Sequence, residues 1–267
     1  MTIRVVVAGA TGWTGSALVK AIAASGDLAL AGGVARSVAG RDIGEANGLT
    51  RIGVLVSATL REALAAPSDV VIDYTHPTLV KEHTLMALAA GRHVVIGTSG
   101  LTAEDYREID AAATKARRGV IAAGNFSITA TLLTRFAVEA AKYLADVEVI
   151  DYASAGKPDV PSGTTRELAE RIAAVRAGGS SVAVSDVLGP REARGAAIGD
   201  GNPVQLHSLR LPGYVIAAEA IFGAPDERLT IRHDAGSSAA PYVAGTLLAA
   251  RKVVGRVGLT RGLDTLI

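Results

Sequence analysis

The sequence predicts an α/β protein in which a doubly wound parallel sheet is followed by an α+β domain with an open mixed sheet. Two patterns support this fold class. In the first half of the chain, short β-branched runs alternate with longer amphipathic stretches, which is typical of consecutive βα units. After Asn125, strand-like runs follow one another without helices between them, which indicates antiparallel or mixed pairing. We therefore predict domains at residues 1–125 and 126–236, with residues 237–267 returning to the first domain.

The first domain is predicted from five buried strands and the helices between them. The strands are expected at Ile3–Ala8, Leu28–Ala35, Val70–Asp73, His93–Ile96 and Gly119–Ala122. The helices are expected at Trp13–Ser25, Leu60–Ala66, Leu79–Ala90 and Thr102–Arg117. Pro77 and Thr102 lie near helix starts, while Gly26 and Gly91 lie just past helix ends, where helix capping favours these residue types.

The second domain is predicted to begin with a helix at Ile128–Tyr143 and a strand at Val147–Ser154. A polar loop at Ala155–Thr165 leads into a helix at Arg166–Val175, and the glycine-rich segment Arg176–Pro203 is predicted as a long surface loop or lid. The remaining elements are strands at Val204–Leu211, Tyr214–Phe222 and Glu227–His233, and a last helix at Pro241–Val254.

Composition excludes several classes of protein. The 267 residues are 49% hydrophobic and 20% charged, which supports a sizeable core and argues against disorder. The 27 basic and 26 acidic side chains leave a net charge of +1, too little to attract a nucleic acid. The chain has no cysteine, its start lacks an export signal, and no apolar run approaches the roughly 20 residues that span a bilayer. We expect a cytoplasmic protein without nucleic-acid, membrane or metal partners.

A glycine-rich turn follows the first predicted strand. Gly9, Gly12 and Gly15 form a G-x-x-G-x-x-G pattern that runs directly into a helix. Such glycines permit a tight turn, so that backbone N–H groups and the positive end of the helix can hold a pyrophosphate. This position at the first βα junction predicts a Rossmann-type dinucleotide site, with contacts from Gly9, Thr11, Gly12, Trp13, Thr14 and Gly15. For Trp13 the alternative is packing at the start of the helix.

The end of the second strand predicts which nucleotide binds. Rossmann sites that prefer NADH place an acid there, but this chain reads Ala35-Arg36-Ser37. Arg36 can pair with a 2′-phosphate or stack on the adenine, and Ser37 can add a hydroxyl. We therefore predict NADPH as the preferred cofactor, with NADH possible; the alternative is that Arg36 is a solvated loop residue.

Two further strand ends lie at the edge of the sheet where α/β proteins bind ligands. They comprise Asp73–Pro77 and Gly97–Gly100. We expect Tyr74, Thr75, Gly97 and Thr98 to line the nicotinamide, although each hydroxyl could instead form a turn or a cap.

Six motifs, in order along nearly the whole chain, resemble those of the dihydrodipicolinate (4-hydroxy-tetrahydrodipicolinate) reductase family. They are Gly9–Gly15, Gly97–Gly100, Gly124–Ser127, Lys157–Thr164, His207–Gly213 and Arg232–Asp234. The resemblance implies NAD(P)H-dependent reduction of a cyclic dicarboxylate imine on the diaminopimelate and lysine route. It also implies a homotetramer, or at least a homodimer, built through the second domain, and it adds Asn125 and Phe126 to the cofactor site.

The stretch K-x-D-x-P-S-G-T, from Lys157 to Thr164, is the most specific of these motifs. The resemblance implies that Lys157 is the catalytic lysine and that Ser162, Gly163 and Thr164 bind a substrate carboxylate. The chemistry agrees, because a reduced imine nitrogen needs a proton and a carboxylate needs cationic and N–H donors. The alternative for Lys157 is a solvated loop charge.

One departure from the family pattern lies just before this lysine. The family carries a histidine pair in the pattern E-x-H-H-x-x-K, with the first histidine linked to proton transfer, whereas this chain has Ala153 and Ser154. Ser154 can still hydrogen-bond a substrate, but neither residue carries a charge. Lys157, Asp151 or Tyr152 remain as proton donors, and we predict weak turnover of the standard substrate. A second departure is Ile216–Glu219, where relatives often read A-H-Q-E.

Three alternatives follow from these departures. The chain can be an imine or carbonyl reductase that acts on another substrate, or a non-catalytic sensor that binds NADP(H). A short-chain dehydrogenase or epimerase is disfavoured because no tyrosine has a lysine four residues later. We interpret His83 and His93 as capped or exposed imidazoles, and His207 and His233 as structural hydrogen-bonding residues.

Overall fold

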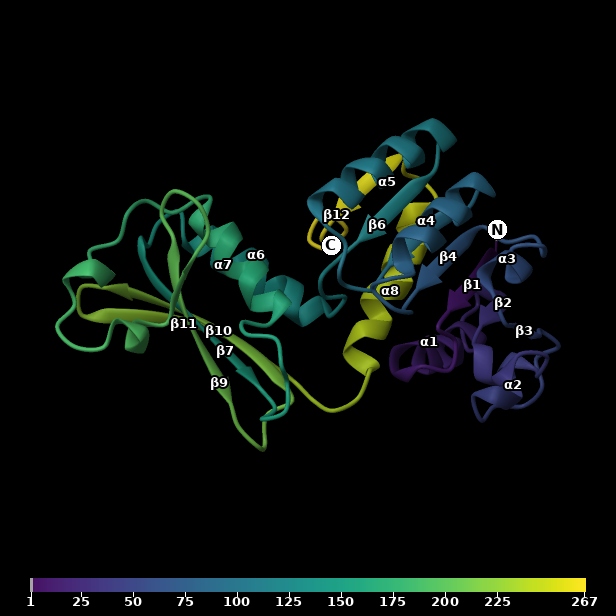
Figure 1. Cartoon of the computed structure of the whole chain (residues 1–267), viewed down its shortest axis with the longest axis horizontal. Helices are drawn as coiled ribbons and strands as arrows, with labels where there is room; N and C mark the ends of the chain where they lie inside the picture. The colour runs from purple at the N-terminus through teal and green to yellow at the C-terminus, as the bar shows by residue number, and fades with distance from the viewer. Residues whose placement is uncertain (1) are drawn as a thin grey trace. The chain divides into compact units, whose positions relative to one another are not determined.

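The computed structural model describes residues 2–267, which form two compact units. The first unit contains the residues up to Ile128 together with Ala239–Ile267, and the second contains Thr129–Ser238 (Figure 1). Each unit has its own sheet and its own hydrophobic core. Within residues 2–267, no helix is long and apolar enough to cross a membrane.

The first unit is built on a seven-stranded sheet in which all neighbouring strands are parallel. In spatial order the strands are β12 (Gly258–Arg261), β6 (Gly119–Ala122), β5 (His93–Ile96), β4 (Val70–Asp73), β1 (Ile3–Ala8), β2 (Leu28–Val34) and β3 (Val56–Ser57). The helices are α1 (Trp13–Ala23), α2 (Ile43–Ala46), α3 (Leu60–Ala63), α4 (Val80–Ala89), α5 (Ala103–Ala116) and α8 (Ala240–Val253). The order of the strands reverses between β1 and β4, which is where doubly wound sheets bind ligands.

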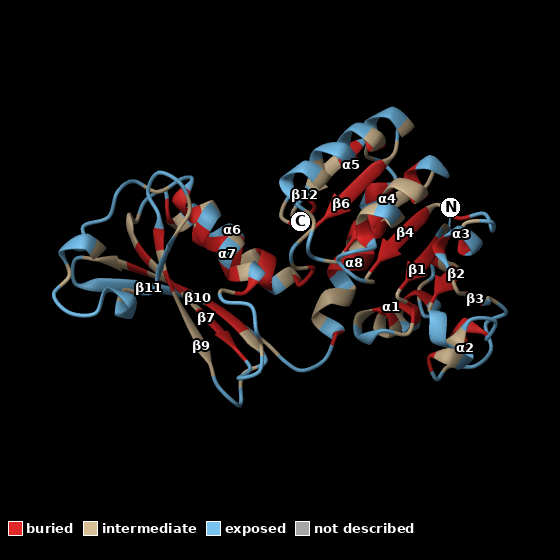
Figure 2. Cartoon of the chain, viewed as in Figure 1, coloured by how far each residue is buried: buried red, intermediate tan, exposed pale blue. Residues whose placement is uncertain are grey.

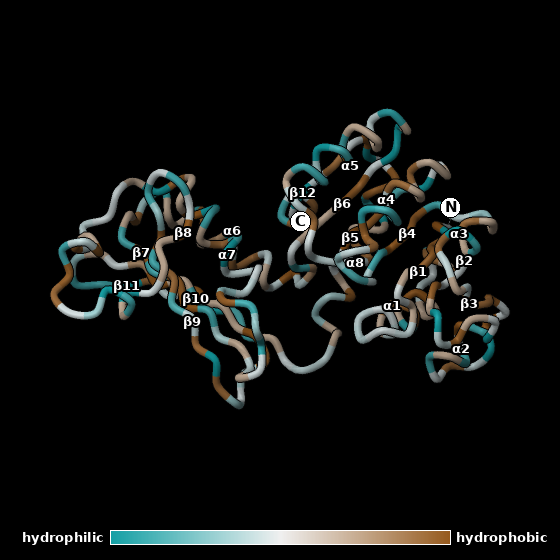
Figure 3. Tube along the Cα trace, viewed as in Figure 1, coloured by the Kyte–Doolittle hydropathy of each residue, from teal (hydrophilic) through white to brown (hydrophobic). Residues whose placement is uncertain are grey.

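Both faces of this sheet are covered, so its strands are apolar without interruption. Val5 and Val7 of β1 pack in a core with α1 and α8, while Val6 packs in a second core with α3, α4 and α5. All three valines are completely buried, and Figures 2 and 3 show the same burial and hydrophobicity along the neighbouring strands. A parallel sheet covered on both faces has this composition because successive side chains point into opposite cores.

The second unit contains a five-stranded mixed sheet. In spatial order its strands are β11 (Glu227–Ala235), β10 (Ile216–Ala224), β7 (Asp146–Ala153), β9 (Val204–Arg210) and β8 (Ala196–Ile198). Only β7 and β9 pair in parallel among the described strands of this sheet. Its helices are α6 (Ile128–Ala140) and α7 (Gly163–Ala173), and side chains of both pack on one face of the sheet, against Val149 and Phe222. The predicted fold class is confirmed.

Several elements differ from the prediction. Helix α7 begins at Gly163 instead of Arg166, so Gly163 and Thr164 form its first turn. The segment predicted as a loop at Arg176–Pro203 contains two 3-10 turns and β8, which pairs with β9. Strands β3 (two residues) and β12 (Gly-Leu-Thr-Arg) and helix α2 (Ile-Gly-Glu-Ala) were missed. None of them contains an apolar run like those of the equally short β4, β5 and β6, so the sequence carries no pattern for them.

Candidate active site

The glycine turn brings three backbone segments of the first unit into close contact. Gly9 has φ +84°, and a Cβ atom there would lie 2.3 Å from the carbonyl oxygen of Tyr74. A Cβ atom on Gly15 would lie 1.9 Å from the carbonyl oxygen of Gly9. Helix α1 starts after Gly12 without a capping side chain and without an acid in its first turn. Its first N–H groups are therefore available to an anion, and the turn fits the pyrophosphate of a dinucleotide.

A large pocket of about 820 Å³ lies at the carboxyl ends of β1, β2 and β4. Gly9, Arg36, Tyr74 and Thr75 line it, as the predicted cofactor site requires, whereas Ser37 is exposed and does not line it. The sequence interpretation missed a set of lining residues that come mostly from α3 and α4: Thr59, Leu60, Arg61, Glu62, Leu79, Glu82, His83 and Met86. Arg61 supplies a second guanidinium to the same pocket as Arg36.

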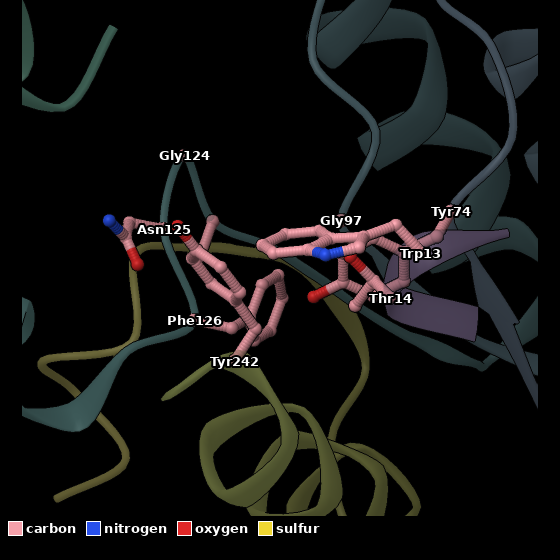
Figure 4. A pocket seen from close by; sticks show the side chains of 9 residues that line it. Trp13, Thr14, Tyr74, Gly97, Gly124, Asn125, Phe126 and Tyr242 are labelled. Carbon is pink, nitrogen blue, oxygen red and sulfur yellow. The ribbon is translucent and has the colours of Figure 1, made fainter. Parts of the chain in front are cut away.

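A smaller pocket of about 190 Å³ lies at the start of α1 (Figure 4). Six of the predicted cofactor residues line it: Trp13, Thr14, Tyr74, Gly97, Asn125 and Phe126. Tyr74 lines both pockets, and its ring packs so closely on Gly97 that a Cβ atom there would lie 2.1 Å from the ring. The backbone at the end of β5 can therefore accept the Tyr74 ring only with glycine at position 97.

The same pocket contains an aromatic residue that the sequence interpretation missed. Tyr242, from α8, lines the pocket and meets Trp13 edge to face, with ring centroids 5.7 Å apart. Trp13 is 58% exposed, so this contact does not bury it. No local pattern indicates Tyr242, because it lies 229 positions after Trp13 and reaches the pocket only through the return of α8 to this unit.

Asp73, at the end of β4, organises the polar groups beside these pockets. The carboxylate is completely buried and accepts hydrogen bonds from the backbone and hydroxyl of Thr75, from the hydroxyl of Thr98 and from Nδ1 of His83 at 2.8 Å. Burial by itself would raise the pKa of Asp73, but His83 and the two threonines hold this pKa below its usual value. The prediction that His83 is a capped or exposed imidazole is wrong, because its side chain is 13% exposed and pairs with Asp73.

In the second unit, Lys157 lies in the loop between β7 and α7. Its ammonium group contacts the carboxylate of Asp159, and its backbone N–H donates to the carbonyl of Ser154. Helix α7 then starts at Gly163 with Ser162 as its N-cap residue, and the Ser162 side chain does not cap the helix. The Ser162 hydroxyl is buried and has no hydrogen-bond partner. A Cβ atom on Gly163 would meet nothing within 4 Å, so the space in front of this helix end is open.

The two residues at the histidine positions have different environments. Ala153 is completely buried at the end of β7, whereas Ser154 is exposed directly after it. Ala153 pairs with Ile216 on one side and with Arg210 on the other. The chain's own packing therefore leaves no solvent-filled space at Ala153.

Asp151 and Tyr152 are poorly suited to donate a proton. Burial would raise the pKa of Asp151, but the Ser162 amide and the Arg210 guanidinium hold this pKa below its usual value, so the carboxylate stays ionised. Tyr152 points to the opposite face of the sheet and donates to Glu219 at 2.7 Å. Burial and Glu219 raise the pKa of Tyr152 to about 12. These observations favour Lys157 among the three groups.

No group of three or more His, Cys, Asp or Glu side chains within residues 2–267 is arranged to hold a metal ion. On the second sheet, His207 hydrogen-bonds to Glu148 at 2.7 Å, and Glu148 also contacts Arg194. His207 and Arg194 therefore both bind the Glu148 carboxylate.

Comparisons with known proteins cover both units. The family description "Dihydrodipicolinate reductase, N-terminus" matches residues 3–126, and "Dihydrodipicolinate reductase, C-terminus" matches residues 129–266. The chain is 39% identical over 270 residues to the 4-hydroxy-tetrahydrodipicolinate reductase of Thermosynechococcus vestitus. This alignment covers 99% of this chain and 97% of the relative. It is also 39% identical over 273 residues to the enzyme of the same name from Gloeobacter violaceus, with both chains fully covered.

Solved structures agree with these matches. A dipicolinate-bound dihydrodipicolinate reductase from Paenisporosarcina sp. TG-14 superposes with a TM-score of 0.84 at 30% identity and covers all of both chains. An amine dehydrogenase from Mycobacterium smegmatis, at 16% identity, superposes with a TM-score of 0.70 over 99% of this chain and 96% of its own, and shares the fold alone. Since both halves match the family and relatives near 40% identity span the whole chain, the chain belongs to the dihydrodipicolinate reductase family of NAD(P)H-dependent oxidoreductases.

Proposed function

We propose that this protein reduces a cyclic imine that carries carboxylate groups, and that it uses NADPH in preference to NADH. The observation that carries the proposal is that each unit presents a helix end without a side-chain cap beside the residues of a family motif. In the first unit this helix is α1, behind the glycine turn; in the second it is α7, behind Lys157 and Ser162. Both helix ends favour anions, which fits a dinucleotide and a carboxylate substrate.

The first unit is proposed to hold the cofactor, which when bound supplies the hydride. Gly9, Thr11, Gly12 and Gly15 would hold the pyrophosphate through the turn, and Trp13, Thr14, Asn125 and Phe126 would form the smaller pocket at its side. Arg36 would pair with the 2′-phosphate, because the larger pocket that it lines also contains Arg61. Two guanidiniums support the preference for NADPH, although Glu62 and Glu82 line the same pocket.

The second unit is proposed to hold the substrate. The N–H groups of Gly163 and Thr164 and the hydroxyl of Ser162 would bind one carboxylate at the start of α7, with Ser154 as a further hydrogen-bonding group. Lys157 is the only basic residue between Asp151 and Thr165. Its ammonium would attract the anionic substrate and supply a proton to the imine nitrogen as the hydride arrives at carbon.

A second candidate function is reduction of a different imine or carbonyl compound on the same scaffold. The observation that favours it is the pair Ala153 and Ser154, because neither side chain can transfer a proton in place of a histidine. A non-catalytic sensor of NADP(H) is the third possibility. The open space at Gly163 and the unpartnered Ser162 hydroxyl argue against it, because a sensor needs no substrate-carboxylate site.

A comparison of substrates tests the proposal. The initial rate of NADPH oxidation is measured with the cyclic dicarboxylate imine of the family reaction and with cyclic imines that carry one carboxylate or none. The proposal predicts reduction of at least one carboxylate-bearing imine and no reduction of the uncharged one. Faster reduction of an uncharged imine would favour the second candidate, and cofactor binding without reduction of any imine would favour the sensor.

A further inference from the structure

An ion pair between a buried carboxylate and a partly exposed guanidinium lies beside the Lys157 loop. The carboxylate of Asp151, on β7, is completely buried, and Oδ2 accepts a hydrogen bond from Nη2 of Arg210, on β9, at 2.8 Å. Ser208, also on β9, donates to the same oxygen at 3.2 Å. Asp151 and Arg210 lie on the face of the sheet that carries the helices. Val149 of β7 is two residues from Asp151 and Leu206 of β9 is four residues from Arg210, so they share this face, and both pack in the helix-side core.

This pair fixes both ends of the segment between Lys157 and α7. The Nη2 group of Arg210 also donates to the backbone carbonyl of Asp159, which follows Lys157 by two residues and contacts it. Oδ2 of Asp151 accepts the backbone N–H of Ser162 at 2.9 Å. One ion pair therefore binds the main chain at Asp159 and at Ser162, immediately before the first turn of α7.

Some polar atoms of Asp151, Arg210 and their neighbour Ser162 have no hydrogen-bond partner. Within residues 2–267, six buried side-chain polar atoms have no hydrogen-bond partner, and three of them belong to this cluster: Oδ1 of Asp151, Nε of Arg210 and Oγ of Ser162. Buried polar groups without partners are costly, so they are tolerated mainly where a ligand or water completes them. Half of the six unpartnered atoms therefore lie beside the loop that leads into α7.

We propose that Asp151 and Arg210 are positioning residues, which hold Asp159 and Ser162 so that Lys157 and the first N–H groups of α7 are oriented to receive a carboxylate. The inference rests on the proposed function of this loop as the substrate site. Neither residue needs to touch the substrate, because both act through the main chain of the loop. In a catalytic site, a displacement of about 1 Å can lower the reaction rate on the order of 100-fold, so a small shift of this loop matters.

The test uses three variants of the full chain, Asp151→Asn, Arg210→Met and the double variant, with Arg194→Met as the matched control. Arg194 is also an arginine of the second unit paired with a β7 carboxylate, that of Glu148, and its backbone carbonyl accepts from Gln205, so these contacts lie outside the Lys157 loop. Three quantities are measured: the dissociation constant for dipicolinate, the dissociation constant for NADPH, and the hydrogen–deuterium exchange of the peptide that covers residues 157–163 without ligand.

Positioning predicts faster exchange of this peptide in both single variants and a dissociation constant for dipicolinate raised about 10- to 100-fold. NADPH affinity should stay within about twofold. The double variant should bind dipicolinate no more weakly than the single variant with the larger loss of affinity, because both changes remove the same ion pair. Unchanged exchange, or a loosened loop with unchanged dipicolinate binding, would overturn the inference. If a single variant does not fold, Arg210→Lys and Asp151→Glu replace it. They keep the charges and change only the position of the charged groups, and the same measurements apply.

The two levels of the proposal can fail separately. If the wild-type protein binds NADPH but not dipicolinate, the proposed substrate is wrong, and the exchange measurement still decides whether the ion pair holds the loop. If the wild-type protein binds dipicolinate and all variants bind it equally, the substrate site stands and the positioning role is refuted.

Discussion

The hydroxyl of Thr98 donates a hydrogen bond to Oδ1 of Asp73 at 2.8 Å and thereby joins the carboxyl ends of the neighbouring strands β5 and β4. The same hydroxyl accepts the backbone N–H of Thr75 at 2.8 Å. Thr98 was predicted to contact the cofactor, and it does not line either described pocket. We therefore propose that Thr98 shapes the site by fixing the strand ends, with Asp73 as the shared acceptor.

This relationship predicts a stability difference at acid pH. His83, Thr75 and Thr98 hold the pKa of Asp73 below its unfolded-state value despite its burial. The ionised Asp73 therefore stabilises the fold above the unfolded pKa of about 4, and this contribution is lost as the pH falls through the lower folded-state pKa. Asp73→Asn should lower the melting temperature at neutral pH and flatten its fall as the pH drops below the unfolded-state pKa of about 4. Asp200→Asn, an exposed control, should follow the wild-type curve; parallel curves for wild type and Asp73→Asn would contradict the assignment.

The proposed role of Arg36 predicts a selective loss of NADPH affinity. Arg36→Ala should remove a charge-assisted hydrogen bond of about 1.5–3 kcal/mol from NADPH binding and leave NADH binding nearly unchanged. Isothermal titration with each cofactor measures both constants. Arg41→Ala is the matched control, because Arg41 is exposed and does not line the larger pocket. Equal weakening of both cofactors by Arg36→Ala would exclude a 2′-phosphate contact.

Lys157 should matter more for turnover than for cofactor binding. Lys157→Met removes the charge at similar length, so NADPH affinity should persist while kcat/KM for an anionic imine collapses by at least about 100-fold. Lys142→Met, in an exposed pair with Glu139, provides the control and should leave both values unchanged. Near-normal kcat/KM in Lys157→Met would make Lys157 a loop charge and favour the second candidate function.

The missing histidines predict slow turnover of the standard dicarboxylate imine. Loss of a general acid typically lowers the rate about 10²- to 10⁴-fold, so Ser154→His and the double variant Ala153→His/Ser154→His should accelerate the reaction. Because Ala153 is completely buried, the double variant must displace its neighbours, whereas Ser154→His changes an exposed position. The initial rates and melting temperatures of both variants are compared with wild type. A fast wild-type rate that neither variant changes would show that the histidines are dispensable.

The face of the second sheet that α6 and α7 leave uncovered leads us to predict self-association. Helices α6 and α7 cover one face. The other face carries the exposed Arg232, which contacts Glu219 and through it the buried Tyr152, beside the partly buried Ile150 and Ile221. An open sheet face of this kind is usually covered by another copy or another protein. Light scattering at micromolar concentration should therefore give the mass of a tetramer or dimer. Ile221→Glu should shift it toward one chain, and a wild-type monomer would refute the proposal.

Much of the first unit is determined by local sequence. Strands β1, β4, β5 and β6 have the predicted bounds, because a strand buried on both faces is a continuous apolar run that ends where polar or glycine residues begin. The glycine turn and the stretch Lys157–Thr164 were also visible in the sequence, since each brings its functional groups together within eight residues.

Only the tertiary structure decided which distant groups meet these motifs. Tyr242 joins Trp13 through the return of α8, His83 joins Asp73 across the start of α4, and Arg210 joins Asp151 although 59 positions separate them. Helix packing brings the first two pairs together and strand register brings the third together, and neither leaves a local pattern in the chain. Residue type and spacing therefore determined which chemistry the chain can supply, whereas the register of β7 against β9 determined which charge lies behind the Lys157 loop.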